Sequence, residues 1–227
     1  MSRVPVLLTH RERMSRYYGF QSNIYDATRW MFLYGRSQII NDVIIRPGHT
    51  VIEIGCGTGH NFEPILKRIT ESGKLIGVDC SKPMLKCASA RTKKQGWKNI
   101  QLVDEEYGRG AITEGQADVV LMSYSLSMIP NWQSALKCAK SELKPGGTMG
   151  IVDFWFGELG RMSEGFAHWL NLNHVDIDRP YENVLTAMFQ PARFRTHNAF
   201  AGLWKYFRFV GVKPMKAGNG AARNPES

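Results

Sequence analysis

The sequence has few cysteines and no long apolar run, and both shortages limit what the chain can be. Its four cysteines form no C-x-x-C pair and have no histidine at ligand spacing, so the pattern predicts reduced thiols, with neither a metal site nor a disulfide framework. No run approaches the roughly 20 apolar residues of a membrane span. The run from Val4 to Leu8 is too short for the core of a secretory signal. A cytoplasmic protein is therefore expected.

Acidic residues are scarce at the two ends of the chain. Residues 1–48 hold seven Lys and Arg against three Asp and Glu, and residues 191–227 hold seven against one. The formal net charge of +9 therefore lies at the ends, which favours a polyanionic surface, although solvated termini would give the same pattern. Because the basic ends carry mainly apolar runs rather than base-stacking residues, we expect no nucleic acid but an anionic membrane surface, to which the protein binds peripherally.

Apolar, β-branched runs alternate with helical patterns along the middle of the chain. This alternation predicts an α/β protein with a doubly wound, Rossmann-like, mainly parallel sheet and ligands at the carboxyl ends of its strands. Strands are predicted at Thr50–Ile54, Lys74–Val78, Ile100–Val103, Asp118–Ser123 and Thr148–Asp153, with a final edge strand at 206–212. Helices are predicted at Asn61–Thr70, Lys82–Gly96 and Trp132–Leu143, and a turn at 144–147. The predicted units are an N-terminal helical cap (1–45), one domain (46–216) and a disordered tail (217–227).

The most informative stretch is the glycine loop that follows the first strand. Gly55, Gly57 and Gly59 alternate there, and residues without Cβ let a backbone approach a ligand closely. A dinucleotide fingerprint needs a sixth-position glycine, where this chain has His60. A phosphate-binding P-loop needs Lys and Ser or Thr after the last glycine, where His60 and Asn61 stand. The loop therefore predicts a cofactor site that binds neither a dinucleotide nor the phosphates of a nucleotide.

Glu53, two residues before the first glycine, favours a ligand with positive charge. S-adenosylmethionine carries an ammonium and a sulfonium group. The stretch resembles the first motif of the class I S-adenosylmethionine-dependent methyltransferases, which implies that fold with about seven strands. The resemblance also implies that the glycine loop meets the methionine part and that Glu53 meets its amino group. S-adenosylhomocysteine would be the product.

Asp79 ends the second predicted strand, where a carboxylate can accept hydrogen bonds from two ribose hydroxyls or cap the next helix. By the resemblance, Cys80 and Met84 pack on the adenine and an acid after the third strand reads its amino group, although Val103 replaces the usual glycine there. The residues expected to bind the cofactor are Tyr25, Arg36, Glu53, Gly55, Cys56, Gly57, Thr58, Gly59, Asp79, Cys80, Met84, Asp104, Glu105 and Ser123.

The acceptor is predicted from a second resemblance. The stretch from Ile24 to Arg36, the Ser123–Ser127 loop and Asn173–Val175 look like the lipid N-methyltransferases that trimethylate diacylglyceryl homoserine to a betaine lipid. Methyltransferases of phosphatidylethanolamine share parts of this pattern, and quinone C-methyltransferases share the early Tyr-Asp. The resemblance implies an amine-headed lipid substrate, possible supply of the homoserine lipid by a partner enzyme, and Tyr25 and Arg36 over the cofactor.

Methyl transfer mainly requires alignment of two atoms and exclusion of water, so a strong base is not obligatory. The candidates for taking the amine proton are Tyr25, His174 and Asp153. Aromatic faces would stabilise the methylated head group; the candidates are Tyr25, Trp30, Tyr34, Tyr124, Trp132, Trp155 and Trp169. The lipid carboxylate could meet an arginine, the candidates being Arg29, Arg179, Arg193 and Arg195.

Overall fold

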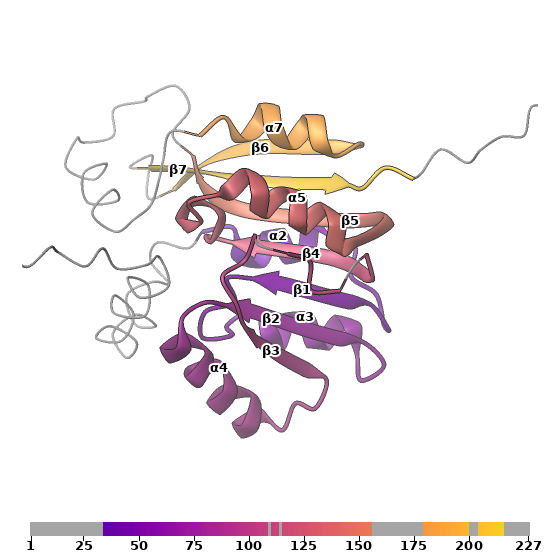
Figure 1. Ribbon diagram of the computed structural model, residues 1–227, viewed down its shortest axis with the longest axis vertical. Helices are drawn as coiled ribbons and strands as arrows, with labels where there is room; N and C mark the ends of the chain where they lie inside the picture. The colour runs from indigo at the N-terminus through magenta and orange to yellow at the C-terminus, as the bar shows by residue number, and fades with distance from the viewer. Residues whose placement is uncertain (1–33, 109, 114, 156–178, 200–203, 216–227) are drawn as a thin grey trace, which may run out of the picture.

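The computed structural model describes residues 34–108, 110–113, 115–155, 179–199 and 204–215. Its centre is one seven-stranded sheet in the order β3-β2-β1-β4-β5-β7-β6 (Figure 1). The strands are β1 (Thr50–Ile54), β2 (Lys74–Asp79), β3 (Ile100–Asp104), β4 (Ala117–Ser123), β5 (Leu143–Trp155), β6 (Ala192–Ala199) and β7 (Trp204–Val212). The helices are α2 (Arg36–Asp42), α3 (Phe62–Ile69), α4 (Lys82–Gln95), the short 3-10 helix η1 (Leu126–Met128), α5 (Trp132–Glu142) and α7 (Tyr181–Met188).

The first five strands are parallel, and β7 runs antiparallel to both of its neighbours, β5 and β6. This arrangement confirms the predicted Rossmann-like sheet and its seven strands. Parallel strands are buried on both faces, which explains why the central strands read as continuous apolar runs. The order of the sheet reverses between β1 and β4, and ligands bind outside the carboxyl ends of strands at such a point.

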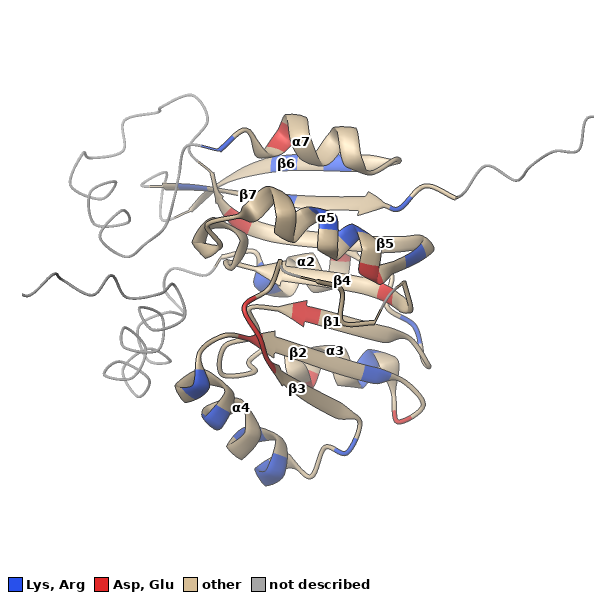
Figure 2. Cartoon of the chain, viewed as in Figure 1, with Lys and Arg blue, Asp and Glu red and all other residues tan. Residues whose placement is uncertain are grey.

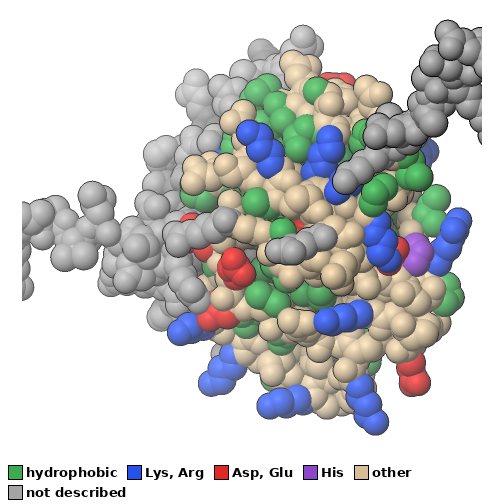
Figure 3. Space-filling model, turned by 45° about the vertical axis from the view of Figure 1, so that its right-hand side comes forward, with side chains coloured by type: hydrophobic (Ala, Val, Ile, Leu, Met, Phe, Trp, Pro, Cys, Tyr) green, Lys and Arg blue, Asp and Glu red, His purple; other side chains and the backbone are tan. Residues whose placement is uncertain are grey.

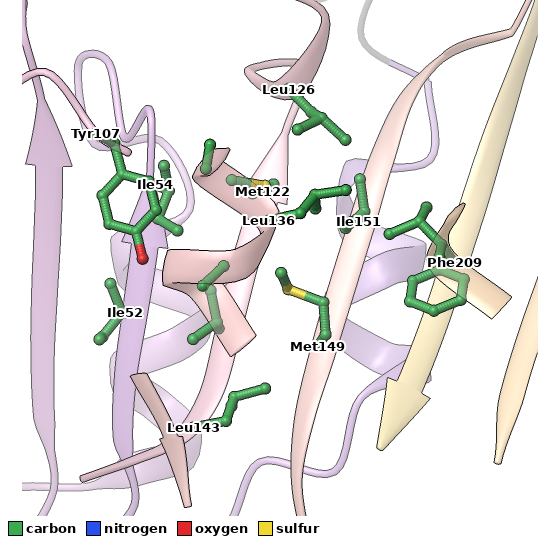
Figure 4. Packing of buried hydrophobic residues seen from close by; sticks show 14 of the residues in the cluster. Ile52, Ile54, Tyr107, Met122, Leu126, Leu136, Leu143, Met149, Ile151 and Phe209 are labelled. Carbon is green, nitrogen blue, oxygen red and sulfur yellow. The ribbon is translucent and has the colours of Figure 1, made fainter. Parts of the chain in front are cut away.

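Two hydrophobic layers cover the sheet. Residues of α2, α3 and α4 pack on one face, and residues of α5 and α7 pack on the other. Figure 4 shows Leu136 of α5 lying over Met122 and Ile151 in the second layer. Fully burying each such side chain stabilises the fold by about 1.5–3 kcal/mol. The rigid layers fix the loops at the carboxyl edge of the sheet.

Two predictions about the chain's last strands are wrong. Residues 144–147 belong to β5 rather than to a separate turn, and they form an irregularity, because Ala117 pairs with Leu143 while Val119 pairs with Thr148. The strand predicted at 206–212 is internal: β7 lies between β5 and β6, so the edge strand is β6. The predicted cap lies largely outside the described residues, as does the predicted tail. No helix among the described residues is long and apolar enough to cross a membrane.

Glu142 at the end of α5 ties the loop after β3 to the core. Its side chain is fully buried, and it accepts hydrogen bonds from the Ile112 N–H, from the Thr113 N–H and hydroxyl at 2.7 Å each, and from the Tyr107 hydroxyl at 3.4 Å. Four donors therefore converge on one carboxylate.

A Glu142→Gln variant is expected to lower the free energy of unfolding by about 2 kcal/mol, because the amide turns its own N–H groups toward at least one buried donor. For a chain of this length, the melting temperature should fall by roughly 4–8 °C. Glu63→Gln on the exposed side of α3 is the control and should leave the melting temperature unchanged. Equal melting temperatures for all three proteins would contradict the role of Glu142.

Candidate cofactor site

The loop after β1 is pinned to both neighbouring strands. The Gly55 and Cys56 N–H groups donate to the Val78 carbonyl of β2 at 2.8 and 3.0 Å, and the Ser125 hydroxyl donates to the Ile54 carbonyl at 2.8 Å. Gly55 has a φ of +70°, and a Cβ there would lie 2.3 Å from Cβ of Ser125. Glycine is therefore required for the chain to turn between β2 and the loop after β4.

Gly57 faces open space instead. Its φ is +56°, and a Cβ built on it would meet no atom of the described residues within 4 Å. Its N–H donates to Oδ2 of Asp79 at 2.9 Å, while Oδ1 of the same carboxylate accepts from the Ser81 N–H at 2.8 Å. Asp79 thus holds the loop in place, and no described residue covers the loop at Gly57. A backbone so placed can lie directly against a ligand.

Asp79 joins the glycine loop to the start of α4. Its carboxylate accepts the N–H of Ser81, the residue before α4, and it also orients the glycine loop. A carboxylate oxygen can accept more than one hydrogen bond, so such a group can also bind hydroxyls. The expected hydrogen bonds to two ribose hydroxyls stay a prediction. Glu105 donates its N–H to the Asp79 carbonyl at 3.1 Å, and Asp104 is the strand partner of Asp79. The three acids therefore lie at one edge of the sheet, where Figure 2 shows acidic segments at the end of β1 and in the loop after β3.

Glu53 is buried at the carboxyl end of β1, with 2% of its surface exposed. Its Oε1 accepts a 2.6 Å hydrogen bond from Nδ2 of Asn61, whereas its Oε2 is buried with no hydrogen-bond partner among the described residues. Burial raises the pKa of Glu53 to about 7, against the lowering effects of the Asn61 hydrogen bond and the Arg36 charge. A buried carboxylate oxygen without a donor is expensive, and an ammonium group would satisfy it.

Asn61 connects Glu53 to the residues around it, and the sequence analysis did not single it out. Its Oδ1 accepts from Nη2 of Arg36 at 2.9 Å, and its Nδ2 also lies 3.3 Å from Oγ of Ser123. Arg36 starts α2 and Ser123 ends β4, so three elements meet at this amide. One sequence feature could have pointed to Asn61: it is a polar residue directly before α3, the helix that follows the glycine loop.

The remaining residues expected at the cofactor are distributed around this loop. Cys56, Thr58 and Gly59 are buried within it, and burial raises the pKa of the Cys56 thiol. Cys80 is half-buried after β2, and Met84 is buried in the first turn of α4. All four cysteines are free thiols. The described residues contain no cluster of His, Cys, Asp or Glu that could hold a metal ion. Tyr25 lies outside the described residues.

Of the three predicted proton acceptors, Asp153 alone lies in the described part of the chain; His174 and Tyr25 lie outside it. Asp153 is fully buried, and its two oxygens accept the Ser127 N–H at 2.9 Å and the Phe154 N–H at 2.8 Å. Burial raises its pKa, and these hydrogen bonds oppose the rise. The bond to Ser127 thus holds η1 against β5, and a role in proton transfer stays a prediction.

The described aromatic candidates divide between the two faces of the sheet. Trp132 packs edge-on against Tyr181, and Trp155 packs against Phe194 and Phe207 on the face of α5 and α7. On the α2 side, the Tyr124 hydroxyl donates to the Tyr34 carbonyl at 2.6 Å. The four rings therefore do not surround one point. Arg179, an expected carboxylate partner, donates from Nη1 to the Leu126 and Ile129 carbonyls at 2.9 Å each.

The site fits S-adenosylmethionine at three places. Glu53 offers a buried acceptor to the ammonium group, Gly57 leaves room for the close approach of the methionine part, and Asp79 sets a carboxylate, an acceptor suited to ribose hydroxyls, beside the loop. Together with the order of the sheet, these features define a class I S-adenosylmethionine-dependent methyltransferase.

The comparisons with known proteins agree. Residues 52–149 match a methyltransferase domain family. A demethylmenaquinone methyltransferase of Staphylococcus carnosus is 31% identical over 181 residues, which cover 70% of this chain and 73% of that protein. The chain therefore belongs to the S-adenosylmethionine-dependent methyltransferase family. A demethylmenaquinone methyltransferase of Lactococcus lactis is 32% identical over 106 residues, but the match spans only 47% of this chain and 42% of that relative's length.

A solved structure shows the same fold. The phosphoethanolamine N-methyltransferase 2 of Haemonchus contortus, in complex with phosphomonomethylethanolamine and S-adenosylhomocysteine, gives a TM-score of 0.77 at 17% identity. The similarity covers 93% of this chain and 62% of that one. At this identity, the likeness concerns the fold alone.

Proposed function

We propose that this chain transfers a methyl group from S-adenosylmethionine to a lipophilic acceptor, first of all to the ring carbon of a demethylated isoprenoid quinone. The observation that carries methyl transfer is the buried Glu53 oxygen beside an open, anchored glycine loop. The support for a quinone is the 31% identity with a demethylmenaquinone methyltransferase over 73% of that protein's length. This support is stronger than that for the lipid amine predicted from the sequence.

An amine-headed lipid, diacylglyceryl homoserine before phosphatidylethanolamine, is the second candidate. It is supported by the resemblance of the Ile24–Arg36 stretch to lipid N-methyltransferases and by the place of Arg36. That resemblance expects Arg36 at the cofactor, and the Arg36 guanidinium does hydrogen-bond Asn61 beside Glu53. A partner enzyme that supplies the homoserine lipid belongs to this second proposal.

In either reaction, the chain's own residues bind and orient. S-adenosylmethionine supplies an activated methyl group when bound. Glu53 would hold the amino group, with Arg36 and Asn61 fixing the carboxylate of Glu53, and Asp79 would hold the ribose while it keeps the glycine loop in place. Such positioning is the main requirement of an in-line methyl transfer.

Incubation with methyl-labelled S-adenosylmethionine and four acceptors tests the proposal: a reduced demethylmenaquinone, diacylglyceryl homoserine, phosphatidylethanolamine and RNA. We expect the label on the quinone ring by mass analysis of products. Label on a lipid amine would replace the first candidate by the second. A Glu53→Gln protein, run in parallel, should lose most of the transfer and so excludes a contaminating enzyme. Transfer to RNA alone, or to none of the four, would overturn both candidates.

A further inference from the structure

Three arginines gather at the outer end of the sheet, away from the glycine loop. Arg193 and Arg195 of β6 and Arg208 of β7 line a surface pocket together with Asp42, at the end of α2, and Val210. Figure 2 shows basic segments on these two neighbouring strands. On the face seen in Figure 3, by contrast, many of the Lys and Arg side chains stand singly, with space between them.

The register of the two strands places like charges against each other. Arg195 is directly opposite Arg208, and Arg193 is two residues from Arg195 on the same face. Like charges directly opposite each other destabilise a sheet, and the side chains of such a pair begin only about 5 Å apart. Asp42, which pairs with Arg208, is the one carboxylate among the described residues that lines the pocket. The pocket therefore keeps an excess of two positive charges.

The neighbours of Arg208 hold it in place. Its side chain is 15% exposed, and its Nε donates to Nε2 of His197 at 3.1 Å. Burial lowers the pKa of His197, and the positive charge of Arg208 lowers it further, which disfavours an additional positive charge beside the arginines. Arg193 and Arg195 are exposed beside this fixed guanidinium. A guanidinium group can donate two parallel hydrogen bonds to two oxygens of one phosphate group. The three neighbouring arginines therefore suit a phosphate ligand.

We propose that this arginine pocket binds the phosphate groups of anionic phospholipids and so holds the enzyme on a bilayer. The choice of a bilayer rests on the proposed function, because a quinone and a diacyl lipid are both dissolved in membranes. Helix α2 connects the pocket to the cofactor site. Helix α2 carries Arg36 at its first position, beside Asn61, and Asp42 at its last, which places the two ends about 9 Å apart.

The test is co-sedimentation of the full chain with vesicles of phosphatidylcholine alone or mixed with phosphatidylglycerol, without S-adenosylmethionine or acceptor. Binding should rise with the phosphatidylglycerol content and fall with salt. An Arg193→Gln/Arg195→Gln protein should bind the mixed vesicles about 30-fold more weakly, roughly fivefold for each charge. The control, Lys93→Gln/Lys94→Gln, removes the same charge from the exposed end of α4 and should bind nearly as well as the native chain.

A second variant separates function from folding. Arg195→Glu places a carboxylate opposite Arg208, so the melting temperature should rise while vesicle binding is lost. Equal losses in the glutamine variant and the lysine control would overturn the pocket, as would binding that ignores phosphatidylglycerol. Full displacement by millimolar inorganic phosphate would assign the pocket to a free anion and overturn the bilayer. Because no acceptor is present, failure here is distinguishable from failure of the proposed methyl transfer.

Discussion

A Gly57→Ala variant is expected to bind S-adenosylmethionine about 100-fold more weakly than the native chain, a loss of about 2.7 kcal/mol. Among the described residues the added methyl group meets no atom within 4 Å, so it adds the strain of a positive φ, about 1–2 kcal/mol. In the complex it would occupy the space where the loop approaches the methionine part. Titration calorimetry with S-adenosylmethionine gives the affinity, and thermal unfolding gives the stability.

Gly96→Ala is the matched control for this experiment. Gly96 ends α4 with a φ of +69°, and a Cβ there also meets nothing within 4 Å in the described part of the chain. The two variants should therefore lose similar stability, while the Gly96 variant keeps the native affinity. If both variants bind S-adenosylmethionine like the native chain, the open side of Gly57 is not where the cofactor lies.

The second large effect concerns the charge of Glu53. At pH 8 a Glu53→Gln variant is expected to bind S-adenosylmethionine about 100-fold more weakly, because a charged hydrogen bond in a buried place is lost. The affinity of the native chain should fall about tenfold for each pH unit below 7, since the carboxyl must be ionised to accept the ammonium group. In the variant this dependence should disappear.

The same pKa has an opposite consequence for the protein without ligand. The folded pKa of Glu53, about 7, lies above the usual value of 4.5, so the folded state binds a proton between these values that the unfolded state has released. Stability due to this group is therefore present below pH 4.5 and is lost as the pH rises to 7. Above pH 7 the ligand-free Glu53→Gln protein should be more stable than the native chain. Glu63→Gln, the control, should change neither the stability nor the affinity for S-adenosylmethionine. A less stable variant with pH-dependent binding would contradict this account.

The sequence predicted the elements whose signal is local. The run Thr50–Ile54 is apolar and β-branched because parallel central strands are buried on both faces, and the observed strand has these bounds. The glycine loop was readable because its turn requires residues without Cβ. Strand β6 was not predicted, because its exposed arginines and Thr196 interrupt the alternation of apolar and polar residues that indicates a strand. Its packing on β7, where Phe194 stacks on Phe207, makes it a strand.

The geometry of the site was less predictable, because its contacts join distant segments. Arg36 and Asn61 are 25 residues apart, and no local pattern shows that an amide would connect an arginine to Glu53. The raised pKa of Glu53 likewise depends on its burial in the folded chain. The methyl acceptor was the least predictable part of the site. Its prediction rests on Tyr25 and His174, which lie outside the described residues. It also rests on a sequence pattern that methyltransferases with other substrates share in part.

The contacts proposed for the cofactor all address atoms that remain after the methyl group has left. Glu53 would face the amino group, the Gly57 loop the methionine part, and Asp79 the ribose, and S-adenosylhomocysteine keeps all three groups. The loop is anchored by Asp79 and Val78, and none of these protein contacts needs a ligand. The preformed site would therefore hold the spent cofactor nearly as well as the fresh one, and product inhibition would make turnover depend on the removal of S-adenosylhomocysteine.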